Sequence, residues 1–262
     1  MKEAVVNLLK RLRSKLTKGF PNATIVCLKS FYILAVEFEH GFSARYWTTR
    51  RKDGQPRPWY TYSAIEYLQQ LDFSDAAVFE YGAGVSTLFW AMRAKTVRSV
   101  DHDPSWIALL SPQLPENATC VLREEEAAYR NAIDENDMLY DVIVVDGQDR
   151  SRCAVKAVPR LAPKGIIIVD NADWYPDLCA RLRDSGLLEV DMTGFGPINA
   201  YTSTTSFFFD RQFDRRPSVG IQPRGGPGCV RQIVRDFGQT HGTTQGRRRD
   251  ARGPDSGGAE SE

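Results

Sequence analysis

Two closely spaced glycines follow a short apolar run in the segment Glu80-Tyr81-Gly82-Ala83-Gly84-Val85-Ser86-Thr87. Glycine lets the backbone turn tightly and approach a ligand more closely than any residue with a Cβ atom. Ser86 and Thr87 can open a helix, whose first amide groups lack partners within the helix and can face a ligand. This segment therefore predicts a site for a nucleotide-like ligand at a strand-helix junction.

An acidic residue follows these glycines at a sequence spacing typical of nucleotide-binding β-α-β units. Asp101 ends the short predicted strand 97–101, nineteen positions after Gly82. A carboxylate at the tip of the second strand of a β-α-β unit can accept hydrogen bonds from the two hydroxyls of a ribose. A dinucleotide fingerprint also needs glycine at position 87, where this chain has Thr87, so an NAD-dependent oxidoreductase is the less favoured alternative.

Two further acidic motifs end apolar runs, Val145-Asp146-Gly147 and Val169-Asp170-Asn171. Ligands of open α/β sheets gather at the carboxyl ends of the strands, so both motifs should lie near the same ligand. Asp-Gly and Asp-Asn pairs also make ordinary turns and helix caps. A purely structural role for these acids therefore stays open.

The elements that would position these residues alternate between strand and helix patterns over 63–210. The runs 142–145 and 166–169 are continuously apolar, as in strands buried on both faces. This pattern predicts an α/β fold with a Rossmann-like, doubly wound, mostly parallel seven-stranded sheet. The expected strands are 76–81, 97–101, 119–122, 141–146, 165–170, 188–192 and 206–210, and the expected helices are 62–70, 86–93, 104–110, 153–161 and 176–185.

Both ends of the chain differ from this central domain. Residues 1–62 are expected to form a small N-terminal cap that begins with a basic amphipathic helix over 1–18, docked on its own domain or lying on an anionic membrane. The apolar stretch 25–38 is interpreted as paired strands. The aromatic run 56–62 is either a lid or a turn packed on the sheet edge. Residues 211–262 contain few large apolar residues, which predicts a disordered tail.

Composition narrows the class of protein. The 262 residues are 42% hydrophobic with a formal net charge of +1, which fits a globular α/β domain with no general attraction for nucleic acid. No segment is predicted to span a membrane. The five cysteines form no C-x-x-C pair, so neither zinc nor a disulfide framework is supported, and a reducing cytoplasm is expected. The oligomeric state is left open.

Together, the glycine loop, Asp101 and the two strand-end motifs resemble class I S-adenosylmethionine-dependent methyltransferases over residues 60–210. The resemblance implies a late antiparallel strand, matched by 205–209, and the cofactor S-adenosylmethionine. Its methionine part would lie at the glycine motif, its ribose at Asp101 and its adenine near His102 and Trp106, unless Trp106 simply packs in the core. The cofactor-binding residues predicted in this way are Glu80, Gly82, Gly84, Ser86, Asp101, His102 and Trp106.

A metal-dependent subgroup of these enzymes, which includes proteins like catechol O-methyltransferase, binds a divalent ion at similar strand ends. The resemblance implies Asp146, Asp170 and Asn171 as ligands of Mg²⁺, which prefers oxygen donors. Those relatives place a basic lysine three residues after the first acid, where this chain has Asp149. Asp146 and Asp149 are therefore the catalytic candidates, and Arg150 or Arg152 could bind an anionic substrate.

The function predicted from this resemblance is methyl transfer to a small-molecule or glycan-like acceptor, at oxygen. Two alternatives stay open: an NAD-dependent oxidoreductase, and a binding module that keeps the fold and transfers nothing. The acceptor itself cannot be read from the sequence, because acceptor specificity lies in the cap and loops.

Overall fold

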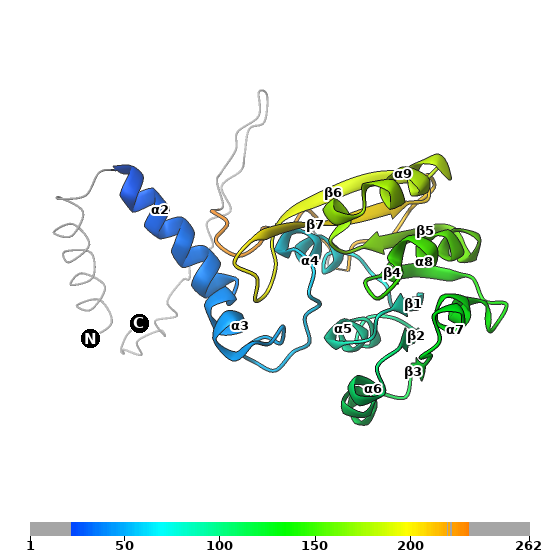
Figure 1. The fold of residues 1–262 in the computed structure, drawn as a ribbon. Helices are drawn as coiled ribbons and strands as arrows, with labels where there is room; N and C mark the ends of the chain where they lie inside the picture. The colour runs from blue at the N-terminus through cyan, green and yellow to red at the C-terminus, as the bar shows by residue number, and fades with distance from the viewer. Residues whose placement is uncertain (1–21, 219, 221, 231–262) are drawn as a thin grey trace, which may run out of the picture. The chain divides into compact units, whose positions relative to one another are not determined.

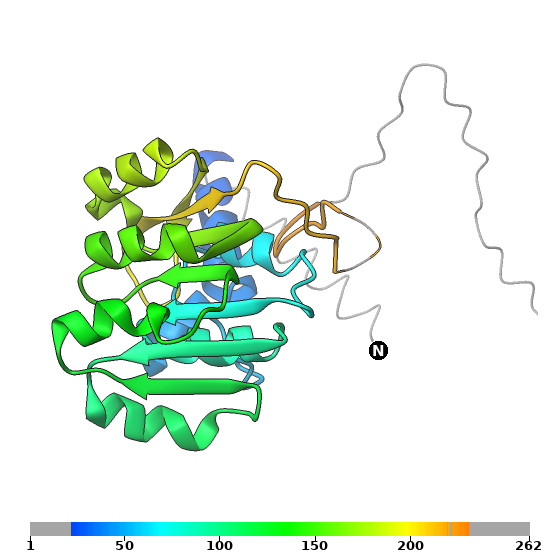
Figure 2. The same ribbon diagram turned by 90° about the vertical axis from the view of Figure 1, so that its right-hand side faces the viewer.

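The computed structural model describes residues 22–218, 220 and 222–230, which contain one seven-stranded sheet with helices on both faces (Figures 1 and 2). The strand order is β3-β2-β1-β4-β5-β7-β6. Strand β7 runs antiparallel to both β5 and β6, and the remaining neighbours pair in parallel. The predicted fold class is confirmed. The strands are β1 Ala77–Tyr81, β2 Thr96–Asp101, β3 Ala118–Leu122, β4 Tyr140–Val145, β5 Leu161–Val169, β6 Leu188–Phe195 and β7 Thr202–Phe209.

The central strands form where the sequence is continuously apolar. Residues 142–145 of β4 pair in register with residues 166–169 of β5, and all eight are fully buried. Alternate side chains of these strands enter two separate cores, one on each face of the sheet. Burial on both faces fixes where each strand ends, and therefore where the acids that follow it lie.

Helices α4 and α5 cover one face of the sheet, and α7, α8 and α9 cover the other (Figure 1). Helix α7 was not predicted; its buried Tyr129 packs into the second core. The helices of the sheet domain are α4 Tyr62–Leu68, α5 Val85–Ala91, α6 Pro104–Leu110, α7 Glu126–Asn131, α8 Arg150–Ala157 and α9 Pro176–Asp184, with short 3₁₀ turns at Ser111–Gln113, Ala132–Asp134, Val158–Arg160 and Ala172–Trp174.

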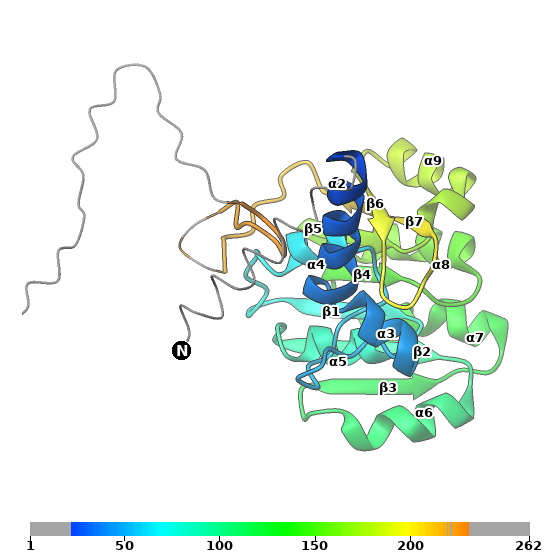
Figure 3. The ribbon, with the colours of Figure 1, turned by 90° about the vertical axis from the view of Figure 1, so that its left-hand side faces the viewer.

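The expectation of paired strands over 25–38 was wrong. This stretch forms helix α2 (Asn22–Tyr32) and a π-helical turn (Ile33–Glu37), followed by α3 (His40–Tyr46), as Figure 3 shows. Its β-branched and aromatic residues favour strands only by propensity, which is weak where no neighbouring strand offers a partner. No residue of α2 is buried, whereas Leu34 and Phe38 beyond it pack against the first core.

Arg57 fastens the cap segments to one another. Its buried guanidinium donates hydrogen bonds to the carbonyl oxygens of Phe38 (2.8 Å) and Thr49 (3.1 Å) and to Oγ of Ser43 (2.6 Å).

The side chains of the aromatic run 56–62 differ in burial. Tyr60 and Tyr62 lie in the core, while Trp59 is exposed. Tyr60 and Tyr62 therefore match the packing alternative, and a lid over the ligand stays a prediction.

Contacts with the sheet domain continue past residue 210. The backbone of Asp72 donates to the carbonyl of Arg216 (2.8 Å), and Leu71 forms a β-bridge with Pro217. The guanidinium of Arg215 pairs with Asp141 at 2.8 Å. The proposed boundaries at 62 and 210 stay predictions, and the expected helix 1–18 and most of the expected tail lie outside the described residues. Within those residues, no helix has the length and apolar character needed to cross a membrane.

Candidate functional site

The turn after β1 is shaped by the close approach of two backbones. Gly82 has a φ of +92°, and a Cβ atom there would lie 2.7 Å from Cα of Gly147, in the loop after β4. A Cβ atom on Gly147 would in turn lie 1.9 Å from the hydroxyl of Tyr129. Gly82 is thus required by packing as well as by its backbone conformation. Sequence reasoning missed Gly147, although its place in an Asp-Gly pair after a strand was a signal.

Glu80 and Thr87 hold the rest of this loop. The Thr87 hydroxyl accepts a hydrogen bond from the amide of Gly84 (3.0 Å) and donates one to Oε2 of Glu80. Glu80 is fully buried, and its Oε1 has no hydrogen-bond partner among the described residues. Burial raises the pKa of Glu80 to about 8. Glu80 therefore supports the loop from behind and is not among the residues that line the cavity, and its role in binding the cofactor stays a prediction.

Asp101 lies at the tip of β2 and is tied to the glycine loop. Its Oδ2 accepts from the amide of Ala83 (3.0 Å), and its Oδ1 accepts from the amides of His102 (2.8 Å) and Asp103 (3.0 Å). Each carboxylate oxygen can accept about two hydrogen bonds, so Oδ2 keeps capacity for a ligand hydroxyl. The prediction that these segments meet is confirmed by this geometry.

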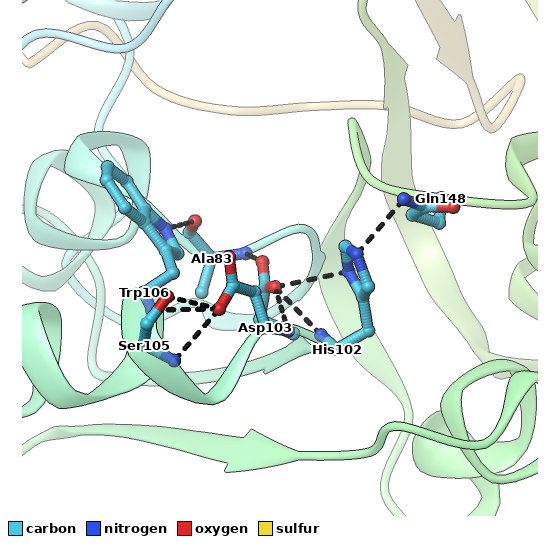
Figure 4. Close-up of polar contacts among 7 residues, drawn as sticks. Ala83, His102, Asp103, Ser105, Trp106 and Gln148 are labelled. Carbon is cyan, nitrogen blue, oxygen red and sulfur yellow. Dashed lines mark hydrogen bonds and ion pairs between the residues drawn. The ribbon is translucent and has the colours of Figure 1, made fainter.

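Trp106 and His102 extend the same wall, as the close-up in Figure 4 shows. The indole N–H of Trp106 donates to the carbonyl of Ala83 (2.6 Å), and Nε2 of His102 lies 3.0 Å from Nε2 of Gln148. Trp106 is 43% exposed, so it is not a core residue. Asp103 caps α6 by accepting from the amides of Ser105 and Trp106, which fixes the helix that carries the indole.

One cavity of about 620 Å³ joins these residues to the cap. It has two halves, which we name by the segments that build them. The loop half consists of Gly82, Ala83, Gly84, Val85, Ser86, Asp101, His102, Trp106, Asp146 and Gly147, and the cap half consists of Trp47, Thr48, Thr49 and Trp59 with Ile198 from the loop between β6 and β7.

The cap half is aromatic and uncharged. The rings of Trp47 and Trp59 stand nearly perpendicular, 88° apart, with centroids separated by 6.4 Å. They are 74% and 40% exposed, so large apolar surfaces face the opening of the cavity. Exposed aromatic faces at a cavity mouth are typical of binding surfaces for planar rings and sugars. From the sequence, Trp59 was noticed only as part of the aromatic run 56–62, and Trp47 was not singled out at all.

Asp146 joins the wall of the cavity beside a buried arginine. Its Oδ1 lies 2.9 Å from Nη2 of Arg150. Burial raises the pKa of Asp146 to about 6, and the positive charge of Arg150 opposes that rise. Asp146 is thus the carboxylate of the predicted catalytic pair that reaches the cavity.

Asp170 and Asn171 do not line this cavity. Asp170 is buried and accepts a hydrogen bond from the Thr205 hydroxyl (2.6 Å); burial, with the nearby Asp146 carboxylate, raises its pKa. The Asn171 side-chain oxygen accepts from Arg150 at 3.2 Å. The residues expected to bind Mg²⁺ are thus already paired with a guanidinium and a hydroxyl, so they do not fit a divalent ion. No group of three or more His, Cys, Asp or Glu side chains that could hold a metal ion occurs within the described part of the chain.

Asp149 lies away from the cavity, which removes support for its predicted role as a base. Its carboxylate contacts Arg130 at 2.7 Å and Arg152 at 3.5 Å. It lines a separate hollow of about 220 Å³, together with Tyr129 and Gln148. The reason is local: Asp149 adopts a left-handed conformation just before α8, which aims its side chain toward α7.

No protein-family model and no curated relative matches this chain. Similar solved structures include precorrin-6y C5,15-methyltransferase from Geobacter metallireducens (14% identity, 56% of this chain and 86% of that chain, TM-score 0.44). Others are the N-methyltransferase NodS from Bradyrhizobium japonicum with S-adenosyl-L-homocysteine (15%, 52% and 79%, TM-score 0.40) and an rRNA methylase from Streptococcus thermophilus (14%, 55% and 92%, TM-score 0.41).

The fold of this chain is defined by its own topology and loops. The late antiparallel strand implied by the resemblance is present as β7, inserted between β5 and β6. The glycine turn after β1 and the acid at the tip of β2 meet across a hydrogen bond. In fold, this chain is similar to the class I S-adenosylmethionine-dependent methyltransferases.

Proposed function

We propose that this protein transfers a methyl group from S-adenosylmethionine to a neutral, small-molecule or glycan-like acceptor, at an oxygen atom. One observation carries the proposal: a single cavity combines the glycine loop and Asp101 with a pair of exposed tryptophans from the cap. The first group suits a nucleoside ligand, and the second suits a ring-shaped partner beside it.

The residues of the loop half fit the cofactor. Gly84 lines the cavity, and a Cβ atom there would stand in van der Waals contact with Oγ of Ser86 (3.7 Å) and with the Trp106 ring (3.9 Å), between the two side chains that would flank the cofactor. Asp101 would accept hydrogen bonds from the ribose hydroxyls, and Trp106 and His102 would flank the adenine. Thr87 occupies the position where a dinucleotide fingerprint needs glycine, and its hydroxyl holds Glu80 and Gly84 together. This substitution argues against NAD.

The residues of the cap half favour an uncharged acceptor. The cap side of the cavity carries two tryptophans, two threonines and Ile198, with no lysine or arginine among its lining residues. Nucleic acids are held chiefly by basic groups that pair with phosphates. Trp47 and Trp59 instead offer apolar faces for a sugar or aromatic ring, and Thr48 and Thr49 offer hydroxyl groups. We therefore place nucleic acid outside the expected acceptors.

Methyl transfer from S-adenosylmethionine would require little covalent chemistry from the protein. S-adenosylmethionine, when bound, supplies an activated methyl group, so alignment of the acceptor provides most of the rate. The carboxylate of Asp146 would accept the proton of the acceptor hydroxyl, since its pKa of about 6 suits a base near neutral pH. The two tryptophans would orient the acceptor and exclude water. Arg150 would keep Asp146 directed to the cavity.

Isothermal titration with S-adenosylhomocysteine and with NAD tests this proposal. We expect S-adenosylhomocysteine to bind, and Asp101→Ala to weaken that binding by more than about tenfold, or roughly 1.4 kcal/mol. Asp137→Ala is the control, because it removes the same charge from an exposed position away from the cavity; we expect less than about a threefold change. Binding of NAD without binding of S-adenosylhomocysteine would refute the proposed function. An unchanged affinity in Asp101→Ala would remove Asp101 from the site.

A further inference from the structure

The guanidinium of Arg150 is surrounded by five oxygen atoms. Its Nε donates to the carbonyl of Gly147 (3.0 Å), and its Nη1 donates to the carbonyl of Asp170 and to Oδ1 of Asn171 (3.2 Å). Its Nη2 reaches the carbonyl (3.3 Å) and Oδ1 (2.9 Å) of Asp146. A guanidinium has five N–H donors, so these five oxygens can use all of them.

This guanidinium is also largely shielded from solvent. The Arg150 side chain is only 12% exposed, and its carbon Cζ lies 5.4 Å from the centroid of the Tyr175 ring. The five oxygens belong to residues that directly follow two neighbouring strands, β4 and β5, whose last four residues are buried and paired in register. The oxygen cage therefore lies at the ends of two packed strands.

Arg150 places a positive charge at an unfavourable position of its own helix. It is the first residue of α8, where the helix dipole disfavours a positive charge, and no acidic residue follows in the first turn. A cation at this place must be stabilised by something outside the helix. The cage of strand-end oxygens provides that stabilisation.

We propose that the Arg150 guanidinium is the built-in cation of this site, holding the Asp146 carboxylate in the cavity wall and occupying the place that a divalent metal ion would need. Two consequences follow. The protein binds no divalent metal at Asp146, and removal of the guanidinium opens an oxygen-lined cage that a divalent ion can enter, since hard cations prefer carboxylate, carbonyl and amide oxygens. Arg150 is a positioning residue, because it acts through Asp146.

Binding of Mn²⁺ alone, followed by electron paramagnetic resonance on the full chain, tests this proposal without any assay of methyl transfer. We expect the wild-type protein to show no Mn²⁺ site that depends on Asp146. Arg150→Ala should gain such a site, at least tenfold tighter than any binding to the wild type, and the double variant Arg150→Ala with Asp146→Asn should lose it again. Mn²⁺ should also raise the melting temperature of Arg150→Ala and leave that of the wild type unchanged.

Arg152→Ala is the matched control, because it removes the same charge from the same helix at an exposed position whose partners are Asp149 and Glu126. It should gain no Mn²⁺ site. Equal gains in both variants would show a simple charge effect and overturn the proposal. Mn²⁺ binding to the wild-type protein that Asp146→Asn abolishes would overturn it even if Arg150→Ala does not fold. A folded Arg150→Ala that binds no Mn²⁺ would refute the cage.

Discussion

The two halves of the cavity are built in opposite ways. The loop half is held in place by backbone contacts and buried hydrogen bonds: Gly82 and Gly147 touch, Asp101 is held by three amides, and Thr87 ties Gly84 to Glu80. The cap half is made of exposed side chains on loops, above all Trp47 and Trp59. The loop half is therefore fixed by the packed sheet, whereas the exposed loops of the cap half can vary independently.

The largest expected effect concerns the fixed half. Gly82→Ala should destabilise the protein by about 3 kcal/mol or more, because a Cβ atom would enter the backbone of the loop after β4 in addition to straining a positive φ. Urea denaturation measures this loss.

Gly186→Ala is the matched control for that substitution. Its φ of +93° is almost the same as that of Gly82, yet a Cβ atom there would meet nothing within 4 Å. It should cost only about 1 kcal/mol, the price of the backbone conformation alone. Equal losses in the two variants would mean that the contact with Gly147 does not matter.

The next effect concerns the buried acid behind the loop. Burial raises the pKa of Glu80 from 4.5 to about 8, so the folded protein holds a proton that the unfolded chain releases. The stability contributed by this group is fully present below pH 4.5 and is lost as the pH rises toward 8. Between pH 6.5 and 8 we expect a loss of about 2 kcal/mol in the free energy of unfolding.

Glu80→Gln isolates this contribution, because it keeps the shape and removes the titration. Urea denaturation at several pH values measures the free energy of unfolding, which should depend less steeply on pH in the variant than in the wild type. If this pH dependence is the same in both proteins, Glu80 is ionised in the folded protein.

The smallest effect concerns the variable half. Trp59→Ala should raise the KM for the acceptor about tenfold, or roughly 1.4 kcal/mol, while affinity for S-adenosylhomocysteine stays within about twofold. Trp174→Ala is the control, since Trp174 is also exposed but does not line the cavity. A loss of cofactor affinity in Trp59→Ala would contradict the division of the cavity into two halves.

Most of the sheet could be predicted from the sequence, because buried parallel strands leave continuous apolar runs such as 142–145 and 166–169. The order of strand ends then brought Gly82, Asp101 and Asp146 toward one place. The stretch 25–38 was misinterpreted for the opposite reason: its residues are apolar, but α2 buries none of them, so no core-facing pattern was present to be read.

Within the site, the predictions failed where a side chain's direction depends on tertiary partners. Asp149 follows Asp146 closely in sequence, but its left-handed backbone turns it toward Arg130. The match of Asp146, Asp170 and Asn171 to metal ligands could not reveal that Arg150 reaches all three residues. Trp47 and Trp59 meet only because the cap folds back, which no short motif records.

The contact between Gly82 and Gly147 bears on how such a protein can change over evolutionary time. At these two positions a single substitution has little room to adjust ligand preference, since an added Cβ atom at either glycine collides with its neighbour. The exposed loops that carry Trp47 and Trp59 meet no such constraint. Chains related to this one should therefore keep glycine at both positions, while these loops vary in sequence.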